Sequence, residues 1–190
     1  YNKKSILLFD RNSLLSVQAI ESIRNFGLIG VYVLEPAEPL PPMTQEDLEF
    51  ERFQIKAVSA IEEELDRILK TRKQSRIQTI ADMVIRNYGH LDEKINFYQN
   101  LRSLEDYVSR HSLNVAILCA MITHVMNIRR EEQYHTVCAA LLHDMGKLKK
   151  HEDVYFGAPY SREDAIRNCE TQEEAYSVIE DAFATEGPAI

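Results

Sequence analysis

The sequence predicts a mainly α fold, in which a helical bundle follows a small strand–helix–strand unit. Two observations lead to this fold class. Near the start of the chain, short apolar runs suited to strands at residues 5–9 and 31–34 flank a segment with helical spacing at residues 13–26. From Thr44 onward, apolar residues recur at helical intervals, which predicts helices for the rest of the chain.

A proline-rich stretch separates the two regions and predicts a stiff, extended linker. Its prolines are Pro36, Pro39, Pro41 and Pro42. A chain of 190 residues can hold one well-buried domain and a small accessory unit. We therefore expect an α/β accessory unit with its linker at residues 1–42, linker helices at 43–100 and a helical domain at 101–190.

Residues 44–72 are expected to form a long helix. Thr44 suits the N-cap position, and acidic residues follow in the first turn, where the helix dipole favours anions. The apolar residues of this helix form one stripe. Such a stripe could pack on the protein's own domain or against a second copy, so a homodimer through helix 44–72 is one prediction.

Further helices are predicted beyond this one. Gly89 is expected to end a helix at 77–88, and Ser161 is expected to cap a helix that begins at Arg162. A separate last helix is expected at 173–183. The other predicted helices span residues 92–101, 106–125 and 131–143.

Composition limits the classes of function. A formal net charge of −8 argues against binding a large nucleic acid, because phosphate neutralisation needs clustered basic residues. No run reaches the roughly 20 apolar residues of a membrane-spanning helix, and no secretory signal is recognisable. Three cysteines without CxxC spacing favour a reducing, cytoplasmic compartment. We expect no membrane partner, whereas the basic run 147–150 suits a small anionic substrate.

The dipeptide His143-Asp144 is the clearest sign of chemistry in the sequence. It follows the apolar run 137–142, which is typical of a buried helix, and burying two such polar side chains costs several kcal/mol unless a partner compensates them. An imidazole nitrogen and a carboxylate oxygen are both ligands of divalent cations. The pair therefore indicates a metallohydrolase or the descendant of one.

His111 is the histidine best placed to join this pair. It opens an apolar helix, and a turn at 127–130 would bring the next helix back antiparallel to it, so that His111 and the His143-Asp144 pair meet at one end. His151 follows the basic run, and the sequence does not decide whether it is a ligand or a surface residue. The remaining histidines are more typical of surface or boundary positions; these are His90, His124 and His135.

Several motifs follow one another between residues 101 and 147. They are Leu101-Arg102-Ser103 before Asp106-Tyr107, His111-Ser112 with Asn114-Val115-Ala116, and Ala140-Leu141-Leu142-His143-Asp144-Met145-Gly146-Lys147. In this order and spacing they resemble the HD superfamily of metal-dependent phosphohydrolases, and within it the HD-GYP branch, the bacterial cyclic di-GMP phosphodiesterases. The N-terminal unit and the helical linker also resemble the accessory region of such proteins.

The resemblance implies site residues, a cofactor and a substrate. It implies His111, His143 and Asp144 as metal ligands, with Asp144 and Lys147 as catalytic residues and Lys147 near the scissile phosphate. Family members usually hold two or more iron or manganese ions, which activate water for attack on the phosphodiester. The implied substrate is a small cyclic dinucleotide or another nucleotide phosphate.

The sequence departs from the family pattern after Lys147. Residues 156–159 read Phe-Gly-Ala-Pro where the family has a Lys-Pro-Gly-type turn. Residues 169–172 contain no histidine where the family places another ligand, and Glu170 is the candidate replacement. The paired histidines and the Gly-Tyr-Pro motif that would come next are absent from this sequence, so the resemblance implies a domain without its C-terminal half. We expect these 190 residues to be inactive or nearly so on cyclic di-GMP.

Three functions stay open. The first is a cyclic di-GMP phosphodiesterase domain in bacterial signalling, and the second is a catalytically degenerate HD-type module that signals or dimerises. The third is an HD hydrolase of a small nucleotide phosphate. The set of His111, His143, Asp144 and Lys147 favours the first, and the missing histidine at 169–172 favours the second.

Overall fold

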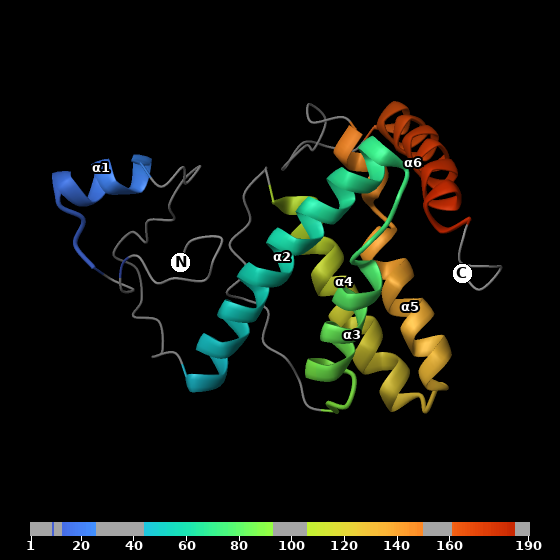
Figure 1. Cartoon of the computed structure of the whole chain (residues 1–190), viewed down its shortest axis with the longest axis horizontal. Coiled ribbons are helices and arrows are strands. Elements are labelled where there is room, and N and C mark those ends of the chain that lie inside the picture. Colours follow the sequence, from blue (N-terminus) through green and yellow to red (C-terminus); the bar gives the residue numbers. More distant parts are fainter. Residues whose placement is uncertain (1–8, 10–12, 26–43, 93–105, 150–160, 185–190) are drawn as a thin grey trace. The chain divides into compact units, whose positions relative to one another are not determined.

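The computed structural model describes most of the chain as helix. The described residues are 9, 13–25, 44–92, 106–149 and 161–184, and no strand occurs among them (Figure 1). The predicted mainly α class is confirmed for this part of the chain. None of the helices in the described ranges is both long enough and apolar enough to cross a membrane.

The chain forms two compact units. The first comprises Tyr1–Lys56 and Phe97–Leu101, and the second comprises Ala57–Asn96 and Arg102–Ile190. The predicted division at residues 42 and 100 stays a prediction.

In the first unit, the predicted helix is present and the strand–helix–strand unit is not seen. Helix α1 spans Val17–Asn25, and the hydroxyl of Ser16 accepts the amide N–H of Ala19 at 3.2 Å. The strands expected at 5–9 and 31–34 lie outside the described residues, apart from Phe9, which is not in a strand. The proline-rich linker also lies outside them.

Helix α2 spans Gln45–Thr71 and begins where the sequence predicts. The hydroxyl of Thr44 accepts the amide N–H of Asp47 at 3.1 Å, and the Asp47 carboxylate accepts the amide N–H of Thr44 at 2.8 Å. In the second unit the apolar stripe of α2 is buried, which favours packing within the chain for this part of the helix. The buried residues of this stripe are Ala57, Val58, Ile61, Leu65 and Ile68. A homodimer through residues 44–72 stays a prediction.

A buried carboxylate fixes the turn between α2 and helix α3, which spans Ile77–Tyr88 as predicted. Glu64 is fully buried and accepts the backbone N–H groups of Ser75 and, at 2.8 Å, Arg76. It also accepts the Ser75 hydroxyl at 3.3 Å and lies 3.4 Å from Nε of Arg67. These two N–H groups lie just before the first residue of α3, and negative charge beside a helix N-terminus is favourable, so Glu64 stabilises the start of α3.

Helices α4, Tyr107–Val125, and α5, Arg130–Leu142, lie side by side as an antiparallel hairpin (Figure 1). A Schellman motif ends α4 and reverses the chain, with the N–H of Asn127 donating to the carbonyl of His124 and that of Ile128 donating to the carbonyl of Thr123. Asn127 has the left-handed φ of 52° that this motif requires. The predicted turn at 127–130 is confirmed.

The hairpin packs on α3, and its apolar face forms the centre of the second unit. At the end of the hairpin near its turn, the buried side chain of Gln133 donates to the backbone carbonyls of Ala120 at 2.9 Å and Gly89 at 3.4 Å, which ties α5 to both neighbours. Burial raises the pKa of the Cys119 thiol, as expected for a partly buried core residue. The fully buried apolar side chains include Ile77, Val84, Leu113, Ile117, Val137 and Leu141.

The C-terminal part of the described chain is one helix where the sequence predicts two. Helix α6 runs without a break over Arg162–Phe183, and Ser161 and Asp164 form a capping box at its start. The stretch 169–172, between the two expected helices, contains neither glycine nor proline, and its Thr171 is buried, so nothing interrupts the helix there. The short 3₁₀ helix η1, Met145–Lys149, packs on α6. The expected turn at 157–159 lies outside the described residues, as does the expected helix at 92–101 except for Asp92, which is not helical.

Glu64 gives a test of the fold. We expect Glu64→Gln to lower the free energy of unfolding by about 1–3 kcal/mol, because an amide cannot accept all the donors that the buried carboxylate accepts. Urea denaturation of the two proteins measures this difference. Glu63→Gln is the matched control, since Glu63 is exposed and forms a surface pair with Arg76 at 2.9 Å, a contact worth roughly 0–1 kcal/mol. Equal effects of the two substitutions would contradict the proposed role of Glu64.

Candidate metal centre

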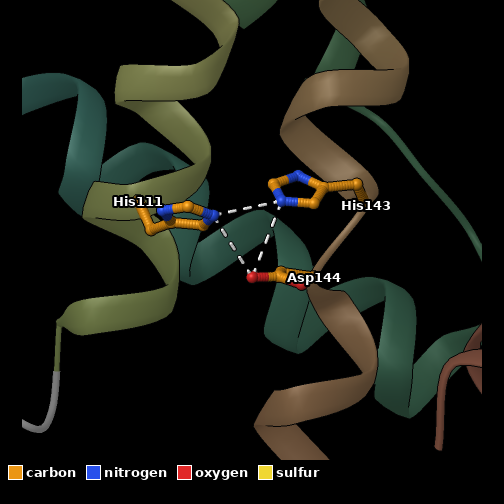
Figure 2. A group of neighbouring side chains, drawn as sticks. All are labelled: His111, His143 and Asp144. Carbon is orange, nitrogen blue, oxygen red and sulfur yellow. Dashed lines mark hydrogen bonds and ion pairs between the residues drawn. The ribbon is translucent and has the colours of Figure 1, made fainter. Parts of the chain in front are cut away.

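Three side chains that the sequence singles out meet at the open end of the α4–α5 hairpin (Figure 2). His111 lies near the start of α4, His143 caps the end of α5, and Asp144 follows it directly. The two Nε2 atoms are 3.2 Å apart. Oδ2 of Asp144 lies 3.4 Å from Nε2 of His111 and 3.6 Å from Nε2 of His143. The antiparallel packing therefore brings these residues together as the sequence predicts.

The spacing of these atoms fits ligands of one divalent ion. Ligand atoms about 2.0–2.2 Å from an ion and separated by about 90–110° lie roughly 2.8–3.6 Å from each other. The three measured separations, 3.2, 3.4 and 3.6 Å, fall in this range. Within the described ranges, these three side chains form a group of histidine and acidic residues close enough to share an ion.

The hydrogen bond of His143 fixes its tautomer. Its Nδ1 lies 2.7 Å from the backbone carbonyl oxygen of Ala140. A carbonyl oxygen only accepts hydrogen bonds, so Nδ1 carries the proton and Nε2 of the neutral ring keeps a lone pair that faces the other two residues. Metal-binding histidines commonly use this arrangement, in which the second ring nitrogen donates to a carbonyl or a carboxylate.

The ring of His111 is held by a neighbour on its own helix. Tyr107, four residues earlier on α4, stacks on it with ring centroids 5.8 Å apart and an angle of 9° between the planes. Residues four apart share a helix face, so the stacking follows directly from the helical spacing. The stack restrains the imidazole plane while its Nε2 faces His143.

The carboxylate of Asp144 is almost completely buried and is contacted from two sides. Its side chain is only 7% exposed. Nζ of Lys147, three residues later in η1, donates to Oδ2 at 2.6 Å. Nε2 of Gln172 on α6 donates to Oδ1 at 3.2 Å. These contacts offset the cost of removing the charge from water.

The contact between η1 and α6 depends on Gly146. A Cβ at this position would lie 2.5 Å from the backbone carbonyl oxygen of Thr171 and 2.9 Å from Oε1 of Gln172. A residue with a side chain would force the α6 backbone away, because a backbone oxygen cannot move alone. The glycine within the His143–Lys147 stretch therefore allows α6 to approach the candidate site.

The other candidate residues do not join the cluster. His90 and His124 are exposed, and His135 is partly exposed beside Tyr134, as expected for surface and boundary positions. His151 lies outside the described residues. Glu170, the candidate replacement for a missing ligand, is exposed and does not belong to the group of His111, His143 and Asp144.

Sequence reasoning missed two residues that contact the cluster. Tyr107 could have been found from its position four residues before His111 on one helix face. Gln172 leaves no local signal, because its contact with Asp144 joins residues 28 positions apart.

The fold and the cluster together define a helical-bundle domain with a candidate metal centre of two histidines and one aspartate. Residues 108–183 match the model of the HD domain family, from the first turn of α4 to the end of α6. This match supports the HD superfamily for this part of the chain, in agreement with the resemblance, and it names no branch. No curated protein and no solved structure matches the chain.

Gly146 gives a test of the contact between η1 and α6. We expect Gly146→Ala to destabilise the protein by about 1–3 kcal/mol, because the added methyl group overlaps the Thr171 carbonyl. The sign is informative, since an unstrained glycine-to-alanine change stabilises a protein by about 0.4–1 kcal/mol. Urea denaturation measures the change, and a more stable variant would show that the approach of α6 is not close.

Proposed function

We propose that this chain carries a metal-dependent phosphohydrolase domain in which His111, His143 and Asp144 bind a divalent cation, manganese or iron. The mutual spacing of the three ligand atoms carries the proposal. The hydrogen bond from His143 to Ala140 supports it, because it leaves a lone pair on the nitrogen that faces the cluster. The match of residues 108–183 to the HD domain favours the same class of enzyme.

The residues of the cluster and Lys147 would have different roles in catalysis. A bound divalent cation supplies Lewis-acid catalysis for the attack of water on a phosphate ester. The two histidines provide neutral nitrogen ligands, and Asp144 provides a negative charge that a cation neutralises. Lys147 holds its ammonium group beside the same carboxylate and keeps 30% of its side chain exposed. From there it would neutralise negative charge on the substrate's phosphate oxygens.

For the substrate, we propose the phosphodiester of a cyclic dinucleotide of the cyclic di-GMP type, in a bacterial signalling protein. The motifs between residues 101 and 147 support this choice over a nucleoside monophosphate, because the His111-Ser112 segment resembles the HD-GYP branch. The net charge of −8 disfavours a large polyanion such as a nucleic acid. A small phosphate substrate needs positive charge only at the cluster, where Lys147 provides it.

The second candidate is a degenerate module that binds a metal or a ligand without turnover. It is favoured by the number of ligands, because the group in the described ranges contains three residues and a two-metal site needs more. Moreover, Gln172 contacts Asp144 from the segment 169–172, in which the family pattern would place a further ligand histidine.

Metal binding gives the first test of the proposal. We expect His143→Ala and Asp144→Ala each to weaken Mn²⁺ binding by more than about 100-fold, beyond the roughly 10–100-fold lost when a hydrogen-bond partner of a metal ligand is removed. Calorimetric titration with Mn²⁺ and elemental analysis of the purified proteins check this. His124→Ala removes an exposed histidine outside the cluster and should bind as the unaltered chain does. Unchanged metal content in both site variants would rule out the proposed centre.

Hydrolysis assays separate the candidate functions. With Mn²⁺ present, we expect turnover of cyclic di-GMP near the detection limit, since three protein ligands provide for one metal, and we expect the remainder to be lost in Lys147→Met. Product chromatography measures this for cyclic di-GMP and for a nucleoside monophosphate in parallel. Faster turnover of the monophosphate would favour the nucleotide hydrolase. Ligand binding without metal-dependent turnover would favour the degenerate module, and rapid cyclic di-GMP hydrolysis would contradict the single-metal site.

A further inference from the structure

The side chain of Gln172 connects α6 to the candidate metal centre. Its Nε2 lies 3.2 Å from Oδ1 of Asp144. An ionised carboxylate only accepts hydrogen bonds, so the NH₂ group of the amide must be the part that faces it. The amide oxygen, Oε1, then lies beside Gly146, 2.9 Å from where a Cβ would be. In this orientation Gln172 is a hydrogen-bond donor to a candidate ligand and not a ligand itself.

The two oxygens of Asp144 have different partners. Oδ1 accepts from Gln172, whereas Oδ2 faces the Nε2 atoms of His111 and His143. The two oxygens are equivalent, so a half-turn of the carboxylate changes nothing, but a partial rotation would break the bond to Gln172 and turn the other oxygen away from the histidines. In a side chain that is only 7% exposed, water is a poor substitute for that bond. Gln172 on one oxygen and Lys147 on the other thus restrain the carboxylate plane in which an oxygen faces the histidines.

Gln172 is itself held in place by the packing of its helix. Thr171, directly before it, is buried, and its backbone carbonyl approaches Gly146 closely. The buried face to which Thr171 belongs continues toward the end of α6, so the amide of Gln172 projects from an anchored helix. The buried residues of this face are Ala175, Val178, Ala182 and Phe183. A donor fixed on a packed helix restrains a carboxylate better than a donor on a loop would.

We propose that Gln172 is a positioning residue of the metal centre. It holds Asp144 with Oδ2 toward His111 and His143, and metal affinity therefore depends on the docking of α6 against η1. This inference rests on the proposed metal-binding function. In this proposal the segment 169–172 contributes a hydrogen-bond donor to a metal ligand and does not contribute a ligand.

The test compares Mn²⁺ affinity with stability in two variants. Gln172→Met keeps the length of the side chain and removes the donor, and Gln172→Asn keeps the amide but is too short to reach Asp144. We expect each to weaken Mn²⁺ binding about 10–100-fold, the range found when a hydrogen-bond partner of a metal ligand is lost. Calorimetric titration gives the affinity, and thermal unfolding without added metal gives the stability. Glu173→Ala, an exposed neighbour on α6, is the control and should bind Mn²⁺ as the unaltered chain does.

The outcomes separate this inference from the proposal on which it rests. If the unaltered chain binds Mn²⁺ and both Gln172 variants bind it equally well, Gln172 has no positioning role, even if the variants unfold at a lower temperature. If the unaltered chain binds no Mn²⁺, the metal centre itself is wrong and the role of Gln172 is wrong with it. Weaker binding in both variants with unchanged unfolding temperatures would establish the positioning role.

Discussion

The buried carboxylate of Asp144 is the group on which the arrangement of the candidate site depends. An unpaired carboxylate with 7% exposure would cost several kcal/mol, so the residues around it must compensate the charge. Lys147 does so with a short bond to Oδ2, and Gln172 does so through Oδ1. The two histidine nitrogens lie on the remaining side of the carboxylate, where a bound divalent cation would further offset its negative charge.

These partners come from α4, the end of α5, η1 and α6. The packing of these four elements brings them to one carboxylate. The Schellman motif at Asn127 turns α5 back along α4, so that His111 and His143 meet at the end of the hairpin opposite the turn. Gly146 then lets α6 approach η1 closely enough for Gln172 to reach Asp144. Glu64 of α2, which accepts N–H groups at the start of α3, and Gln133, between α5 and its neighbours, hold the helices of the bundle together.

The sequence predicts those features that depend on local patterns. The end of α3 follows from Gly89 and the start of α2 from Thr44 and Asp47, and the structure confirms both. The meeting of His111 with the His143-Asp144 pair follows from helical spacing and one short turn. The contact between Gln172 and Asp144 could not be predicted, because it depends on how α6 packs on η1 and joins residues 28 positions apart. The unbroken α6 was also missed, since polar residues alone do not end a helix when glycine and proline are absent.

The central claim is that His111, His143 and Asp144 bind one divalent cation. Anomalous diffraction from crystals grown with Mn²⁺ tests it most directly, because it locates the ion without any assay of activity. We predict one strong anomalous peak about 2.0–2.3 Å from the two Nε2 atoms and Oδ2 of Asp144. Absence of a peak at this point, with Mn²⁺ bound elsewhere or not at all, would contradict the claim.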